Sequence, residues 1–160
     1  AENAHWQVGK VLYATINLPA ANNHYLAAAG RNSEYEDRTV ANRFWLNRLF
    51  TLARGDKLDA IVLFSEGDLK PLTDPVAPSL LRRGSPLFDG FAATRKQVLA
   101  LARKFDGKVL LVDSAALGKG KQPEIEWRGN LGHLSVDDQA VEVEVKPGSK
   151  ALFVVKDAAD

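Results

Sequence analysis

Residues 107–120, Gly-Lys-Val-Leu-Leu-Val-Asp-Ser-Ala-Ala-Leu-Gly-Lys-Gly, indicate most clearly how this chain folds. They begin with an unbroken apolar run, Val109–Val112, which is typical of a β-strand covered on both faces. The run stops at Asp113, and small residues and a loop rich in Gly and Lys follow it. In layered α/β folds, functional side chains collect where a buried strand ends in such a loop. A site of the usual α/β kind should have its residues here, but most of them are absent, so this stretch argues against an ordinary active site.

A second unbroken apolar run, Ala60–Phe64, predicts another buried strand. Apolar residues at helical spacing precede each run and predict helices over Glu36–Arg54 and Gly90–Phe105. Because a connection that contains a helix joins parallel strands, we expect the two strands to be parallel neighbours. For the first helix, the spacing predicts a buried face and an N-cap at Asp37 or Thr39. The predicted face consists of Ala41, Trp45, Leu49 and Leu52, widened by Phe44 and Ala53.

The two ends of the chain are predicted to be antiparallel. His5–Leu18 is expected to form a hairpin that turns at Gly9-Lys10 and ends before Pro19. After Gly120, alternating Val and Glu residues predict an antiparallel meander with one exposed face. Its expected strands are Leu131–Val136, Gln139–Lys146 and Lys150–Val155.

Together these elements predict an α/β (α+β) fold in a single domain, residues 1–160. It would have a layered sheet with two main helices, parallel strands in the first two-thirds and an antiparallel β-meander at the C-terminus. Two long connections, residues 20–36 and 65–89, are expected to be loops that contain at most short helical turns.

Composition excludes several classes of protein. The 160 residues are 46% hydrophobic, which is enough for a substantial core, and the formal charge is +1. This charge gives no reason to expect a nucleic-acid partner. No cysteine is present, so disulfides and thiolate metal sites are excluded. No run approaches the roughly 18 apolar residues of a membrane span.

The sequence contains no methionine and begins Ala1-Glu2-Asn3-Ala4. Such a start suits a mature end after removal of a signal peptide, so we expect an exported protein, periplasmic or secreted. The alternative is a fragment whose catalytic half lies on another polypeptide.

Nucleophilic catalysis has weak support in the sequence. There is no Gly-x-Ser-x-Gly elbow. Serines follow both buried strands, at Ser65 and Ser114, but each would need a histidine as its base. Only His5, His24 and His133 are available.

Ligand binding has better candidates. Glu66, Asp68 and Asp113 follow neighbouring strands and could together hold a hard cation, although solvated loop carboxylates are the simpler interpretation. Gly118–Lys121 and Arg82-Arg83 are basic, but neither has the pattern of a P-loop. The candidate ligand-binding residues are Glu66, Asp68, Asp113, Ser114, Lys119 and Lys121.

Several motifs together resemble a known family. They are Trp6-x-x-Gly9-x-Val11-Leu12-Tyr13-x-Thr15-Ile16-Asn17-Leu18-Pro19, Arg38-x-x-Ala41-Asn42-x-x-Trp45-Leu46, the two apolar strands, Asn130-Leu131 and the final Val/Glu alternation. This order resembles the C-terminal half of a bacterial calcineurin-like metallophosphoesterase domain. The resemblance covers most of the chain but rests on scaffold positions.

The chain departs from that family at the metal ligands. The family's D-x-H, G-D and G-N-H-D motifs are absent. Where the family has a pattern like V-H-G-D-x-H, this chain places Asp113 and Leu117 at the two histidine positions. Ser65–Asp68 replaces a turn that contains glutamine. No family metal ligand can be carried over, so we predict no cofactor and no two-metal hydrolysis of the family kind.

Two functional hypotheses follow. The first is a non-catalytic exported binding domain whose partner is another protein or a second copy, because a sheet edge without its missing half must be covered or paired. The second is a metal-dependent phosphoric ester hydrolase with a rebuilt site, in which carboxylates and one histidine hold a single cation. Its candidate ligands are Glu66, Asp68, Asp113, and His24 or His133.

Overall fold

The computed structural model describes residues 3–19, 33–70 and 89–156. The helices and strands follow one another in this order: β1 His5–Val8, β2 Val11–Thr15, α1 Ser33–Gly55, β3 Ala60–Ser65, α3 Ala92–Arg103, β4 Lys108–Asp113, β5 Glu126–Arg128, β6 Leu131–Ser135, β7 Val143–Val145 and β8 Phe153–Val155.

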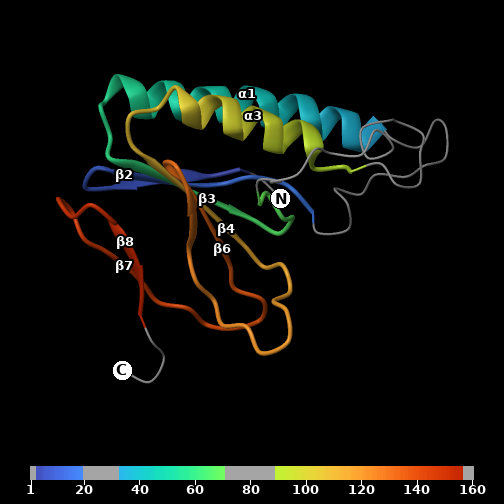
Figure 1. The fold of residues 1–160 in the computed structure, drawn as a ribbon. Helices are drawn as coiled ribbons and strands as arrows, with labels where there is room; N and C mark the ends of the chain where they lie inside the picture. Colours follow the sequence, from blue (N-terminus) through green and yellow to red (C-terminus); the bar gives the residue numbers. More distant parts are fainter. Residues whose placement is uncertain (1–2, 20–32, 71–88, 157–160) are drawn as a thin grey trace.

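The main sheet has the strand order β1-β2-β3-β4-β6-β5. Its four inner strands are parallel, and β1 and β5 pair antiparallel at the two edges. Helices α1 and α3 lie side by side on one face, and the separate hairpin β7–β8 lies on the other side (Figure 1). The predicted fold class is therefore confirmed, including the parallel pairing of β3 with β4.

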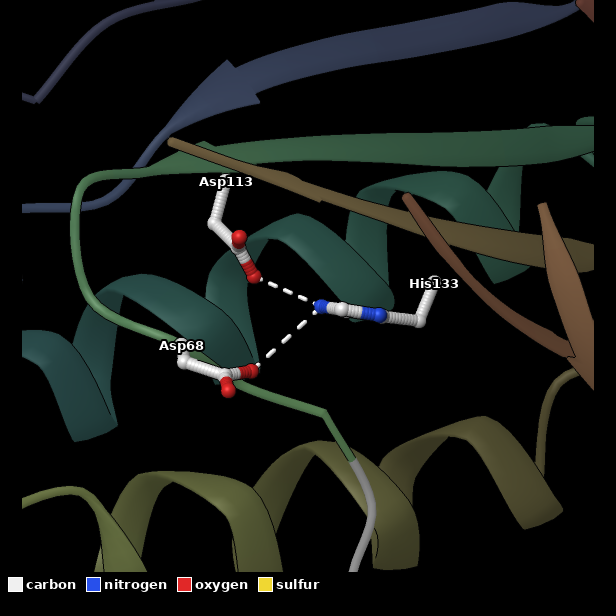
Figure 2. Close-up of side chains that lie close together, drawn as sticks. All are labelled: Asp68, Asp113 and His133. Atoms are coloured by element: carbon white, nitrogen blue, oxygen red, sulfur yellow. Dashed lines mark hydrogen bonds and ion pairs between the residues drawn. The ribbon is translucent and has the colours of Figure 1, made fainter. Parts of the chain in front are cut away.

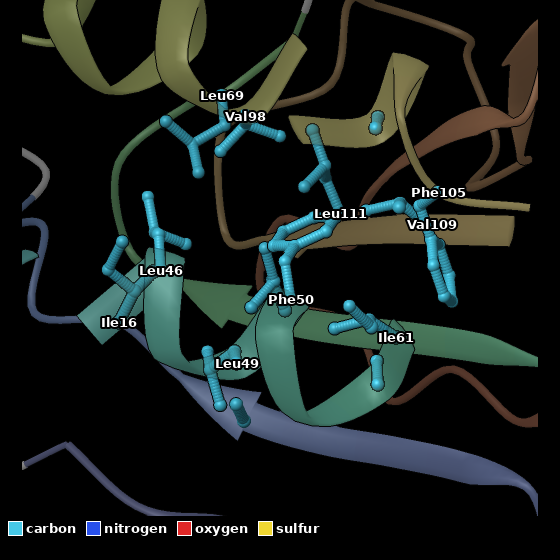
Figure 3. Packing of buried hydrophobic residues seen from close by; sticks show 14 of the residues in the cluster. Ile16, Leu46, Leu49, Phe50, Ile61, Leu69, Val98, Phe105, Val109 and Leu111 are labelled. Atoms are coloured by element: carbon cyan, nitrogen blue, oxygen red, sulfur yellow. The ribbon is translucent and has the colours of Figure 1, made fainter. Parts of the chain in front are cut away.

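The covering of both faces explains the unbroken apolar runs. In β3, Ile61 and Leu63 join the cluster beneath the helices, whereas Ala60 and Val62 join the cluster that includes Phe153 of the hairpin. Figure 3 shows the helix-side cluster, where Ile61 lies near Phe50 of α1. Successive side chains of a strand point to opposite faces, so residues 60–64 of β3 are all apolar because both faces are covered.

The predicted face of α1 was partly wrong. Phe44 is 70% exposed and Ala41 is also exposed, whereas Leu46, which the spacing left out, is fully buried. The face is rotated because it contains a buried polar residue, Asn42, whose Nδ2 donates to the carbonyl of Asn17 at 2.8 Å. A search for apolar spacing assigns such a position to the exposed side.

The predicted N-cap of α1 was also wrong. The helix begins at Ser33, so Asp37 and Thr39 lie inside it. The Thr39 hydroxyl donates to the carbonyl of Tyr35, one turn earlier, at 2.8 Å. This is a bond within a helix and not a cap.

The C-terminal meander differs from the prediction in one strand. Leu131–Ser135 is β6 of the main sheet and pairs parallel with β4, so only β7 and β8 form the C-terminal hairpin. Leu131 and Leu134 are buried on opposite faces, as an inner strand requires. The edge strand β5 was not predicted. Its Trp127 ring lies over Gly132, where an added Cβ would stand 2.7 Å from the ring.

Several sequence predictions fall outside the described residues: His24, Arg82-Arg83, and most of the two long loops. Within the part of the chain that the structure describes, no helix has both the length and the apolar character to cross a membrane.

Candidate metal centre

Three side chains that could ligate a metal meet at the carboxyl edge of the parallel strands. Asp113 is the last residue of β4, His133 lies in β6, and Asp68 follows the end of β3 by three residues. Asp113 and His133 both point toward the helix side, because each follows by two residues a strand residue of the helix-side cluster, Leu111 and Leu131 respectively. Figure 2 shows the Asp68 and Asp113 carboxylates directed at the same nitrogen of the imidazole, Nε2.

The donor atoms are close enough to share one ion. His133 Nε2 lies 2.6 Å from Asp113 Oδ2 and 3.4 Å from Asp68 Oδ1. All three donor atoms lie within 4.8 Å of one another. Ligands bound tetrahedrally to zinc at about 2.1 Å are separated by about 3.4 Å, so small adjustments would place these atoms around a cation.

The site is closed on one side and open on the other. The Asp113 and His133 side chains are 1% and 8% exposed, whereas the Asp68 side chain is 42% exposed. Two of the ligands are thus fixed within the protein interior, and the third lies at the entrance. A cation held here would keep a coordination position facing solvent.

A second layer of hydrogen bonds orients the Asp113 carboxylate. Its Oδ1 accepts from the Ser135 hydroxyl at 2.7 Å and from the backbone N–H of Ala115 at 3.0 Å. Register explains the first bond, because Asp113 and Ser135 are paired residues of β4 and β6. With Oδ1 engaged, Oδ2 is the oxygen that faces His133.

Asp68 is held through its backbone as well as its side chain. Its Oδ1 accepts from the backbone N–H of Lys70 at 2.7 Å, and its carbonyl accepts from Arg95 Nη2 at 2.7 Å. Arg95 belongs to α3 and is anchored by an ion pair with Asp89. The loop that carries the third ligand is therefore attached to the helix layer.

Electrostatics couple the histidine to both carboxylates. Burial lowers the pKa of His133, but the hydrogen bonds and charges of Asp113 and Asp68 outweigh it and raise this pKa to about 9. The hydrogen bond from His133 lowers the pKa of Asp68 to about 2, aided by the Lys70 N–H and the Arg95 charge, although burial opposes the shift. Without metal, an imidazolium lies between two carboxylates, and the excess negative charge favours a divalent cation.

The arrangement is not a serine-nucleophile triad. The Ser135 hydroxyl lies 3.4 Å from His133 Nε2, which is the same nitrogen that contacts Asp113. A triad needs its serine and its aspartate on opposite nitrogens of the imidazole. Of the two serines considered from sequence, Ser65 donates to the carbonyl of Gly67 at 2.7 Å, and Ser114 is exposed.

The structure brings together some of the residues expected from sequence and separates others. Asp68 and Asp113 meet, and His133 joins them as one of the two histidines considered. The others are exposed and lie outside this cluster: Glu66, Ser114, Lys119 and Lys121. Sequence analysis did not select Ser135 or Arg95. Only the strand register, which pairs Ser135 with Asp113, could have indicated Ser135.

Comparison with protein-family models, with curated proteins and with solved structures found no match for this chain. The resemblance to calcineurin-like metallophosphoesterases therefore stays a prediction from sequence.

Proposed function

We propose that this chain is a binding domain whose ligand is one divalent cation, held by Asp68 Oδ1, Asp113 Oδ2 and His133 Nε2. The observation that carries the proposal is the convergence of these three donor atoms within 4.8 Å at the carboxyl edge of the sheet. Two of the three side chains are buried there. Buried ionisable groups at this position in an α/β fold are a common mark of a functional site.

The donor types favour a first-row transition metal. One imidazole nitrogen with two carboxylate oxygens suits Zn²⁺ or Mn²⁺, whereas Ca²⁺ and Mg²⁺ prefer oxygen ligands only. Three protein ligands with one open position match the usual composition of a zinc site that keeps a water molecule.

Equilibrium dialysis of EDTA-treated protein against Zn²⁺ and Mn²⁺ tests the proposal. We expect one equivalent of bound metal in the parent protein and a loss of binding of at least tenfold in Asp113→Ala. Glu66→Ala is the matched control, because Glu66 is an exposed carboxylate that follows the end of the neighbouring strand β3 and lies outside the cluster. Equal binding by the parent and Asp113→Ala would contradict the assignment.

A metal-dependent phosphoric ester hydrolase is the second candidate, and one observation favours it. The exposed side of Asp68 leaves room for a metal-bound water next to the ligands. A cation lowers the pKa of such a water toward neutrality and makes it a nucleophile. Hydrolysis of an aryl phosphate by the metal-loaded protein, lost in Asp113→Ala, is the expected result. No turnover in the metal-loaded parent would exclude this candidate while leaving cation binding intact.

The predicted association with a second copy has a candidate surface in β1. This strand is at the edge of the main sheet, and Trp6 and Val8 are 45% and 63% exposed. Unpaired strand edges with apolar side chains favour strand pairing between molecules. Pairing of two copies through β1 predicts a dimer mass by light scattering, and a strictly monomeric mass would contradict it.

A further inference from the structure

Ser135 is placed to control how the Asp113 carboxylate can bind a cation. Its hydroxyl donates to Asp113 Oδ1 at 2.7 Å, and it lies only 3.4 Å from His133 Nε2. The hydroxyl is thus beside the proposed centre and bonded to the one Asp113 oxygen that does not face it.

The consequence concerns the coordination mode of Asp113. Its Oδ1 accepts two hydrogen bonds, from Ser135 and from the Ala115 N–H, and its side chain is only 1% exposed. These two bonds occupy both lone pairs of Oδ1, so presenting both oxygens to one ion would break at least one of them in a buried setting. Asp113 is therefore held to monodentate binding through Oδ2.

Monodentate binding by Asp113 favours cations that need few ligands. Ca²⁺ takes six to eight oxygen ligands and commonly uses bidentate carboxylates, whereas Zn²⁺ is satisfied by four ligands. We propose that Ser135 is a positioning residue that makes the centre prefer a cation of low coordination number, such as Zn²⁺, to Ca²⁺. This inference rests on the cation site proposed above and adds the residue that sets its selectivity.

Measuring Zn²⁺ and Ca²⁺ affinities of the parent, Ser135→Ala and Ser135→Thr tests the proposal. Loss of a hydrogen bond from the second layer typically weakens metal binding by 10–100-fold. We expect Ser135→Ala to weaken Zn²⁺ binding about tenfold, with Ca²⁺ binding unchanged or stronger, so the Zn²⁺/Ca²⁺ ratio falls about tenfold or more. Ser135→Thr keeps the hydroxyl and should restore the ratio.

A second pair of variants guards against a folding defect. Ser135→Val matches Ser135→Thr in shape and differs by a methyl in place of the hydroxyl, and both suit a strand end. If Ser135→Ala fails to fold, the Thr/Val pair supplies the same comparison. A Zn²⁺/Ca²⁺ ratio that is equal in the parent, Ala and Val variants would overturn the role of Ser135. Absence of metal binding in the parent would instead overturn the proposed site.

Discussion

Raising the pH should destabilise the metal-free protein as His133 loses its proton. In the folded state the pKa of this imidazole is raised from 6.5 to about 9, because the hydrogen bonds and charges of Asp113 and Asp68 outweigh the effect of burial. A raised pKa means that the charged form stabilises the fold. That stability is fully present below pH 6.5 and is lost as the pH rises through 9.

The magnitude follows from the size of the shift. Each pKa unit is worth about 1.4 kcal/mol, so the shift of His133 corresponds to a loss of about 3 kcal/mol between pH 6 and pH 10. The lowered pKa of Asp68 arises mainly from the same hydrogen bond with His133, so it is not a separate contribution to this free energy. A loss of this size is a large part of the stability of an ordinary domain.

Urea unfolding in EDTA at half-unit pH steps measures this effect. The His133→Gln variant is the control, because the difference between the two profiles removes the contributions that the parent and the variant share. We expect the difference to decline by about 3 kcal/mol between pH 6 and pH 10. A constant difference across this range, or a decline centred below pH 6.5, would refute the interaction of His133 with the two carboxylates.

Three further changes test the packing, each by urea unfolding at neutral pH. Leu111→Ala removes a fully buried side chain from the helix-side cluster and should cost about 2–5 kcal/mol, so a loss below 1 kcal/mol would contradict that burial. Gly132→Ala should destabilise by about 1–3 kcal/mol, because the new Cβ would stand 2.7 Å from the Trp127 ring, and unchanged stability would mean that the ring lies elsewhere. Phe44→Ser should change stability by no more than about 0.5 kcal/mol, since Phe44 is 70% exposed. A loss of stability as large as that of a buried residue would mean that Phe44 lies on the buried face of α1, as the sequence predicted.

The layered part of the fold could be predicted because its signals are local. The apolar runs Ala60–Phe64 and Val109–Val112 do not alternate, and only a strand covered on both faces requires that pattern. The helix between them fixed the parallel pairing. These two strands placed Asp113 and Asp68 at the same sheet edge, so part of the candidate site followed from the fold.

The remainder depended on contacts between distant residues. The parallel pairing of β6 with β4 brings His133 and Ser135 to Asp113, and no nearby sequence signal distinguishes this pairing from a meander. The face of α1 was misplaced because Asn42 is buried by a hydrogen bond with Asn17, 25 residues earlier in the chain. Polar residues that are buried by long-range bonds escape any pattern of apolar spacing.

Thermal unfolding with and without metal tests the central claim most directly. At a Zn²⁺ or Mn²⁺ concentration of about 100 times its Kd, binding to the native state adds about 2.7 kcal/mol of stability. For a domain of this size that raises Tm by roughly 5–10 °C above the value in EDTA. We predict this rise for the parent and for Glu66→Ala, and at most about half of it for Asp113→Ala, whose binding should be at least tenfold weaker. An identical Tm for the parent in EDTA, Zn²⁺ and Mn²⁺ would contradict a cation site at Asp68, Asp113 and His133.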